Sequence, residues 1–223
     1  MLLQIPSALE PAHVAQLRQE LARARFEDGR ATVGRGGQEA KQNLQLPLDS
    51  DAARALAPRV LEAVRRNGTF FSAALPQQIF GPVFNRYDVG MTYGDHLDAS
   101  ILGAPTLIRA DVAATLFLSS PDEYDGGELV IQDTFGAHRV KLAAGSMIVY
   151  PASSVHRVER VTRGSRFAAV FWIQSLVRDE ARRRILFDID LTIGSLARKT
   201  PGAAEIERLS AAYHNLLRMW ADN

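Results

Sequence analysis

The hydrophobic pattern changes its period twice along the chain, and this change limits the folds that the sequence can adopt. Between about residues 78 and 176, apolar residues occur in short alternating runs separated by turn residues, whereas helical spacing prevails on either side. Many short strands at such intervals favour a sandwich, a jelly roll or a barrel. The runs predicted to form strands are 79–87, 113–118, 128–133, 138–142, 146–150 and 166–173. The sequence therefore predicts an α+β protein in which a β core, residues 78–176, lies between two helical regions.

The region before this core, residues 1–77, is predicted to be mostly helical and to pack on the core. Ser7 and Glu10 have the spacing of a capping box, which predicts that a first helix begins there. A second helix is predicted from about Ser50 to Arg66, because apolar residues recur there on one helical face.

The region after the core, residues 177–223, is predicted to be a helical extension. Its mixed run of charges at 178–184 is interpreted as a solvent-exposed helix face with salt bridges. The apolar stripe of the last helix could pack on the core or across an interface between two copies, so the sequence leaves open whether the chain forms a homo-oligomer. This stripe consists of Ile206, Leu209, Tyr213, Leu216 and Trp220.

The composition excludes several kinds of site. The chain has 223 residues with no cysteine, so disulfides, thiolate nucleophiles and cysteine-ligated metals are absent. A formal net charge of +1 predicts no nucleic-acid partner. No stretch has the length and apolarity of a membrane span, and the first residues do not resemble a signal peptide. We therefore expect a cytoplasmic protein without a membrane partner.

Three polar residues have the composition of a metal site without sulfur. His96 and Asp98 are two residues apart, so on an extended strand their side chains point to the same side. His156 follows an apolar strand, from which it can face the earlier pair. Two imidazoles and one carboxylate form a facial triad that suits Fe(II) and leaves coordination positions open. The other histidines, His13, His138 and His214, are predicted to lie outside the site.

Arg166 is predicted to bind an acidic ligand near these residues. Arg163 and Gly164 are interpreted as the turn of a hairpin that places Arg166 opposite Val161. Roughly 16 Å of strand would then separate Arg166 from His156. A short keto acid could bridge this distance, with its far carboxylate on the guanidinium fork. Small and apolar residues continue on the same side of the strand, which indicates that Arg166 points inward.

These residues occur in segments that resemble the bacterial PKHD-type (prolyl/lysyl hydroxylase-domain) hydroxylases of the Fe(II)/2-oxoglutarate dioxygenase superfamily. The likeness covers almost the whole chain, which makes it far more specific than any single motif. The segments that carry it are Phe84-Asn85-Arg86-Tyr87, Tyr93-Gly94-Asp95-His96-Leu97-Asp98, residues 114–119, Asp125-Gly126-Gly127-Glu128-Leu129, Tyr150-Pro151, residues 171–175 and Arg182-Arg183-Arg184.

The resemblance implies a double-stranded β-helix, or jelly roll, flanked by helices. It also implies Fe(II) on the His–Asp–His triad, 2-oxoglutarate on Arg166 and L-ascorbate as a reductant, with no catalytic residue beyond the metal centre. Tyr87 and Tyr93 are implied to line the pocket, where one of them could hydrogen-bond the keto acid. Amphipathic rings packed at the mouth of the barrel are the alternative for both.

The implied reaction consumes dioxygen, hydroxylates a substrate and releases succinate and CO2. Halogenating relatives lack the carboxylate at the position of Asp98, so its presence favours hydroxylation. The substrate is left open between a small molecule, with a link to iron or siderophore metabolism, and a peptide side chain. The collagen-type branch has lysine where Arg166 stands, which weakens the inference of a prolyl target.

Two alternatives from other classes remain. A non-redox, cupin-like module that binds a small molecule through a metal would keep the triad but would not need Arg166. A scaffold protein with an inactive site is disfavoured, because all four polar residues are retained.

Overall fold

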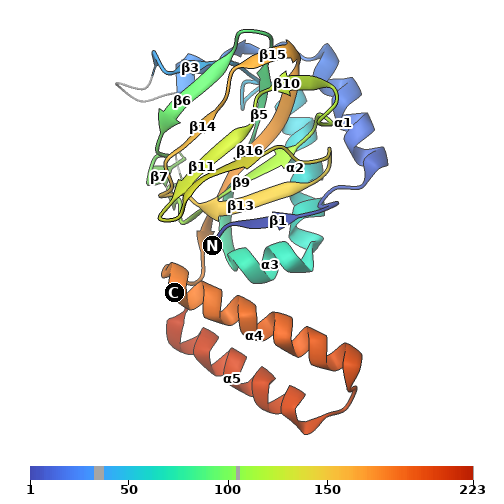
Figure 1. Cartoon of the computed structure of the whole chain (residues 1–223), viewed down its shortest axis with the longest axis vertical. Helices are drawn as coiled ribbons and strands as arrows, with labels where there is room; N and C mark the ends of the chain where they lie inside the picture. The colour runs from blue at the N-terminus through green and yellow to red at the C-terminus, as the bar shows by residue number, and fades with distance from the viewer. Residues whose placement is uncertain (33–37, 104–105, 223) are drawn as a thin grey trace.

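The computed structural model describes residues 1–32, 38–103 and 106–222, and its centre consists of two antiparallel sheets (Figure 1). The larger sheet has the order β1-β13-β9-β16-β5-β4-β2, and the smaller has the order β12-β11-β14-β6-β3. The strands of the larger sheet are β1 (Leu3–Ile5), β13 (Met147–Pro151), β9 (Val112–Phe117), β16 (Arg166–Ser175), β5 (Pro76–Tyr87), β4 (Leu44–Gln45) and β2 (Glu27–Asp28). Those of the smaller sheet are β12 (Gly136–Val140), β11 (Leu129–Asp133), β14 (His156–Val158), β6 (Thr92–His96) and β3 (Lys41–Gln42).

Two short strand pairs complete the β structure. Strand β10 (Tyr124–Gly126) pairs with β15 (Val161–Gly164), and β7 (Ile101–Leu102) pairs with β8 (Ile108–Arg109). These four strands lie where the chain passes from one main sheet to the other.

The two main sheets face each other across a shared apolar layer. Phe117 of the larger sheet and Leu129 of the smaller sheet belong to the same buried cluster, together with Tyr150 and Val158. Every residue of β9 is buried, because helices cover the other face of its sheet. This arrangement is the α+β jelly roll expected from the sequence.

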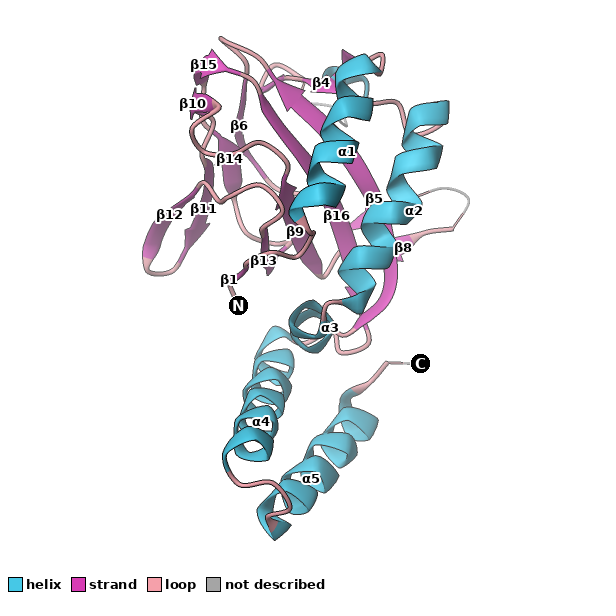
Figure 2. Cartoon of the chain, turned by 90° about the vertical axis from the view of Figure 1, so that its right-hand side faces the viewer, coloured by secondary structure: helices cyan, strands magenta, loops and turns pink. Residues whose placement is uncertain are grey.

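Helices of the first region cover the outer face of the larger sheet (Figure 2). Helix α1 (Pro11–Arg23) and helix α2 (Asp51–Arg66) bury apolar stripes against it, and α3 (Gly68–Ala74) follows directly. The start of α2 matches the prediction, since the Ser50 side chain accepts a hydrogen bond from the Ala53 N–H at 3.2 Å.

The predicted capping box at Ser7 is wrong. Helix α1 begins at Pro11, after Glu10, and no side chain caps it. Proline starts a helix well because it has no N–H to satisfy and a fixed φ. The preceding turn is instead tied to the sheet, since the Leu9 N–H donates to the Gly145 carbonyl at 2.9 Å.

The first region also supplies short strands, besides its helices. Strand β1 pairs with β13, β3 with β6 and β4 with β5, so residues 1–77 contribute to both main sheets. A short 3-10 helix, Gly29–Thr32, lies between β2 and β3. The division of the chain at residues 77 and 176 stays a prediction.

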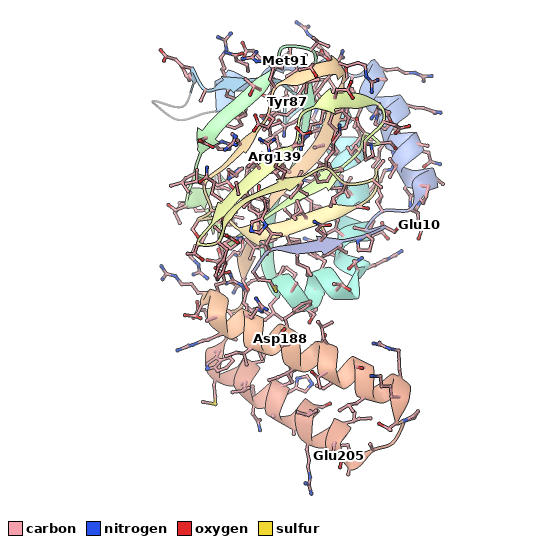
Figure 3. All side chains as sticks on the ribbon, in the orientation of Figure 1. Glu10, Tyr87, Met91, Arg139, Asp188 and Glu205 are labelled. Carbon is pink, nitrogen blue, oxygen red and sulfur yellow. The ribbon has the colours of Figure 1, made fainter. Side chains whose placement is uncertain are left out.

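The last region forms a hairpin of two helices, α4 (Glu180–Lys199) and α5 (Ala204–Trp220), that projects from the barrel (Figure 1). No residue of α5 is fully buried, although Tyr213, Leu216 and Trp220 pack beside a small core that includes Leu186. Figure 3 shows Asp188 and Glu205 on this hairpin, away from Tyr87 in the barrel.

The charge run at the start of α4 differs in one respect from its prediction as an exposed face. Arg183 is buried, and its guanidinium donates to the carbonyls of Val177 and Arg178 at 2.7 Å each. Arg184 stays exposed beside Asp188. In the described residues, no helix is both long enough and apolar enough to cross a bilayer.

Candidate active site

A cavity of about 480 Å³ opens between the two sheets. Its polar lining comes from both of them, with His96 and His156 on the smaller sheet and Arg166 on the larger. Apolar side chains such as Val170 and Trp172 line the same space, which has the size and mixed character of a small-molecule site.

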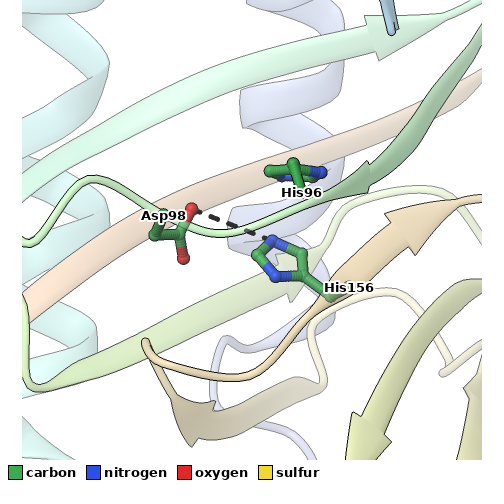
Figure 4. A group of neighbouring side chains, drawn as sticks. All are labelled: His96, Asp98 and His156. Atoms are coloured by element: carbon green, nitrogen blue, oxygen red, sulfur yellow. Dashed lines mark ion pairs between the residues drawn. The ribbon is translucent and has the colours of Figure 1, made fainter. Parts of the chain in front are cut away.

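The three predicted metal ligands meet at this cavity (Figure 4). His96 and His156 are paired residues on the neighbouring strands β6 and β14, and Asp98 follows two residues after β6 ends. One ligand atom from each residue can be chosen so that all lie within 4.8 Å of one another. His156 Nε2 lies 3.8 Å from Asp98 Oδ1, so one cation could contact both.

Backbone carbonyls hold both imidazoles in one orientation. Nδ1 of His96 lies 2.8 Å from the Gly94 carbonyl, and Nδ1 of His156 lies 3.0 Å from the Ser154 carbonyl. A carbonyl can only accept, so each Nδ1 carries the proton and donates. Each Nε2 therefore keeps its lone pair for a metal, which is the usual arrangement of histidine ligands in metal sites.

Burial sets the protonation of the triad. Burial, with a further contribution from neighbouring His156, lowers the pKa of His96 to about 4, so its ring is neutral at pH 7. Burial raises the pKa of Asp98, and the nearby His156 opposes that shift. Asp98 Oδ2 is buried and has no hydrogen-bond partner among the described residues. A divalent cation would satisfy this oxygen, so the donor set fits a resident metal.

Arg166 lies inside the cavity, as predicted. It is 2% exposed, and its guanidinium carbon lies 5.3 Å from the centre of the Tyr87 ring and 5.4 Å from that of Phe117. Within the described part of the chain, Arg166 Nε and the Tyr124 hydroxyl have no hydrogen-bond partner although both are buried. A carboxylate ligand would satisfy a buried guanidinium of this kind.

The predicted hairpin register of Arg166 is wrong. Arg166 pairs with Tyr87 of β5 in the larger sheet and not with Val161. Strand β15 pairs instead with β10, where Gly164 lies opposite Tyr124 with a φ of 70°. A Cβ on Gly164 would lie 2.0 Å from the Glu123 carbonyl oxygen, so glycine marks a close strand crossing and not a turn.

The two tyrosines occupy different parts of the cavity. Tyr87 is buried beside Arg166, and burial raises its pKa to about 12. The ring of Tyr93 stacks on that of His96, with centroids 3.5 Å apart and planes 12° apart. Tyr87 therefore lies next to the place that a carboxylate on Arg166 would occupy, whereas Tyr93 packs on a candidate metal ligand.

The remaining histidines lie outside the candidate site, as predicted. His13 and His214 are exposed on α1 and α5. His138 Nε2 lies 2.8 Å from an oxygen of Asp133, across the hairpin of β11 and β12.

Some lining residues gave no recognisable pattern in the sequence. Lys41 lies on the edge strand β3, which has two residues and thus no readable period. Trp172 also lines the cavity, and its indole N–H is buried without a partner among the described residues.

The fold agrees with comparisons to known proteins. Residues 82–174 match the 2OG-Fe(II) oxygenase superfamily, and residues 180–222 match the PKHD-type hydroxylase C-terminal domain. The chain is 52% identical over 227 residues to a PKHD-type hydroxylase of Xanthomonas axonopodis pv. citri, with 100% of both chains covered. It is likewise 52% identical over 229 residues to one of Methylobacterium nodulans, again covering 100% of both.

Solved structures support the fold. A prolyl-4-hydroxylase of Pseudomonas putida has 21% identity and a TM-score of 0.51, covering 78% of this chain and 92% of that chain. A prolyl hydroxylase of Trichoplax adhaerens, solved with a hypoxia inducible factor peptide, has 14% identity and a TM-score of 0.57, covering 83% and 86%. The full-length likeness at about half identity confirms the expected family: this chain belongs to the PKHD-type hydroxylases and is a 2-oxoglutarate- and Fe(II)-dependent dioxygenase.

Proposed function

We propose that His96, Asp98 and His156 hold the Fe(II), that Arg166 holds the far carboxylate of 2-oxoglutarate, and that the cavity hydroxylates an organic substrate. The observation that carries this proposal is the pair of unsatisfied buried groups in one cavity. Asp98 Oδ2 lacks a partner on the side of the triad, and Arg166 Nε lacks one on the opposite sheet. A metal and a dicarboxylate that chelates it would satisfy both.

The chain's own residues orient the reactants and keep the site dry. Gly94 and Ser154 orient the imidazoles through their carbonyls, and the buried guanidinium of Arg166 selects a diacid long enough to reach it from the metal. When bound, the iron supplies the redox chemistry by which dioxygen, 2-oxoglutarate and a C–H group give succinate, CO2 and a hydroxyl group. The apolar layer between the sheets excludes water from this reaction.

We also propose a reductant, a compartment and a class of substrate. L-ascorbate would keep the iron reduced, and the enzyme would work in the cytoplasm. We favour a small molecule, including one from iron or siderophore metabolism, over a peptide because the cavity, of about 480 Å³, has the size of a small-molecule site. A homo-oligomer would cover the half-buried apolar stripe of α5.

The first test is formation of the iron–cosubstrate complex. Anaerobic Fe(II) and 2-oxoglutarate should give the wild-type protein a weak visible charge-transfer band. His96→Ala and His156→Ala should remove the band while the circular dichroism of the fold persists. His138→Ala is the matched control and should keep the band, because this histidine lies at the β11–β12 hairpin. A fully metal-loaded wild type without the band would contradict the proposal.

The second test separates the oxygenase from a metal-binding module that does not use 2-oxoglutarate. Arg166→Ala should weaken 2-oxoglutarate binding at least tenfold, since a hydrogen bond to a charged group contributes about 1.5–3 kcal/mol. Binding is measured by titrating the band with 2-oxoglutarate. Exposed Arg163→Ala, three residues earlier, is the matched control. Equal affinity in wild type and Arg166→Ala would favour the module.

A further inference from the structure

We propose that Lys41 binds an anionic group of the primary substrate, so that this oxygenase acts on a small organic anion with an apolar body. The inference rests on the proposed function, because it takes the cavity between the sheets to be the active site. It is carried by a buried positive charge that neither the metal nor the cosubstrate uses.

Lys41 is a buried cation with only neutral partners. Lys41 is 8% exposed, and its Nζ donates to Thr32 Oγ1 at 3.0 Å and to Gln45 Oε1 at 3.1 Å. In the part of the chain that the structure describes, no carboxylate oxygen lies within 4.0 Å of Nζ. The residues outside that part, 33–37, 104–105 and 223, contain no acidic side chain.

An ammonium group in this position favours an anionic partner. A buried charge without a counter-charge is unfavourable, and an ammonium has three donors, of which the described residues use two. Burial lowers the pKa of Lys41 to about 8, and nearby Asp28 and Asp98 oppose that shift. Lys41 is therefore still protonated at pH 7, with a donor left for a ligand in the cavity that it lines.

The position of Lys41 is close to the candidate metal but differs from that of Arg166. Lys41 pairs with Tyr93 across β3 and β6, and its Nζ lies 5.4 Å from the centre of the Tyr93 ring. That ring stacks on His96. Arg166 lies on β16 in the opposite sheet. A cosubstrate that bridges the metal and Arg166 has no second far carboxylate, so Lys41 remains for the substrate.

The rest of the cavity selects the body of the ligand. Among the described residues, the charged side chains that line it, apart from the histidines, are Asp98, Arg166 and Lys41, and the first two have proposed roles. Its remaining wall includes Leu48 and Leu97, which are 46% and 59% exposed. Leu102, Phe80 and Trp172 extend this apolar wall. A carboxylate on an aryl or aliphatic body would match both the Lys41 ammonium and the apolar wall, whereas an inorganic anion would use only the ammonium.

The test compares an acid with its uncharged amide on the loaded protein. The probes are 3-phenylpropanoate and 3-phenylpropanamide, titrated anaerobically by ligand-observed NMR into protein with Fe(II) and saturating 2-oxoglutarate. Saturating 2-oxoglutarate occupies Arg166 and the metal, so the acid cannot bind at either. We expect the wild type to bind the acid at least tenfold more tightly than the amide. Equal affinities in the wild type would overturn the proposal, whatever the variants do.

Variants then assign the preference to Lys41. Lys41→Met should remove the preference for the acid, and Lys41→Arg should retain most of it. Lys199→Met is the matched control, because Lys199 lies exposed at the end of α4, and should leave the preference unchanged. A preference that survives in folded Lys41→Met would overturn the proposal.

The cosubstrate titration separates the two proposals. If Lys41→Met weakens 2-oxoglutarate binding as much as it weakens binding of the acid, Lys41 belongs to the cosubstrate site and the inference is wrong. If the wild type never forms the charge-transfer band, the proposed function fails before any probe is added.

Discussion

At the scale of the residue, the candidate site depends on which atoms are already satisfied and which are not. Backbone carbonyls accept hydrogen bonds from the Nδ1–H groups of His96 and His156, so only Nε2 of each ring is available to a ligand. Asp98 and Arg166, in contrast, keep buried polar atoms without partners in the described structure. Since buried polar groups are nearly always hydrogen-bonded in native proteins, these atoms indicate ligands that complete the site.

The two tyrosines should respond differently to loss of the hydroxyl. Tyr87→Phe is expected to weaken 2-oxoglutarate binding about 2- to 10-fold, because a net hydrogen bond contributes about 0.5–1.5 kcal/mol and Tyr87 lies beside Arg166. Tyr93→Phe should leave this affinity unchanged, since the ring of Tyr93, and not its hydroxyl, packs on His96. Titration of the charge-transfer band measures both. A larger effect in Tyr93→Phe would reverse the assignment.

Residue spacing predicted the meeting of the triad well and the lysine not at all. The i, i+2 spacing of His96 and Asp98 and the apolar run 146–150 before His156 indicated that the three side chains could face one another. The strands that carry the two histidines, β6 and β14, have only five and three residues and were not among the predicted runs. Lys41 comes after a glycine-rich stretch and belongs to a two-residue strand. A lone lysine in such a stretch is expected to be exposed to solvent, and only the pairing of β3 with β6 makes Lys41 part of the cavity wall.

At the scale of the element, the long strands of the core were predictable and their partners were not. Strand β16 forms where the alternating run 166–173 predicted it, but it pairs with β5 and β9. A glycine after an arginine has the composition of a hairpin turn, and it equally suits a close crossing between strands. Local sequence cannot distinguish the two, because the partner of β15 is β10, some forty residues earlier in sequence.

Gly164→Ala tests this crossing and its effect on the site. The new methyl group would meet the Glu123 carbonyl at a φ of 70°, so we expect a loss of more than about 1 kcal/mol of unfolding free energy. Weaker 2-oxoglutarate binding should accompany it, because Arg166 is two residues away. Urea unfolding and the band titration measure the two effects.

Gly202→Ala provides the matched control for the backbone alone. Gly202 also has a positive φ, of 80°, but a Cβ there meets nothing within 4 Å. It should therefore lose stability through backbone strain only and keep its affinity for 2-oxoglutarate. Equal losses of stability in the two variants would show that the contact with Glu123 is unimportant.

At the scale of the whole molecule, the candidate site joins the two sheets. The two histidines of the triad belong to the smaller sheet, Asp98 follows the end of its strand β6, and Arg166 belongs to the larger sheet across the cavity. The change of hydrophobic period predicted a β core between helices, and the structure has this order. The short strands β1 to β4 were missed, because two or three residues cannot show a period, and the projection of the α4–α5 hairpin depends on packing that no local pattern encodes.

Because the ligands would bridge the sheets, binding should raise the melting temperature in two separable steps. A ligand present at 100 times its Kd stabilises the folded state by about 2.7 kcal/mol. For a chain of this size, that corresponds to about 5–10 °C. Anaerobic Fe(II) alone should give the first increase in wild type, and 2-oxoglutarate added to the iron-loaded protein should give a second.

Variants of the two sheets should remove these increases separately. Asp98→Ala should lose both, because 2-oxoglutarate has no metal to chelate, whereas Arg166→Ala should keep the iron step and lose most of the second. Differential scanning fluorimetry under anaerobic conditions measures each step, and a chelator should reverse them in wild type. A full second step in Arg166→Ala would mean that the cosubstrate does not reach the larger sheet through this residue, and the bridge between the sheets would have to be sought elsewhere in the cavity wall.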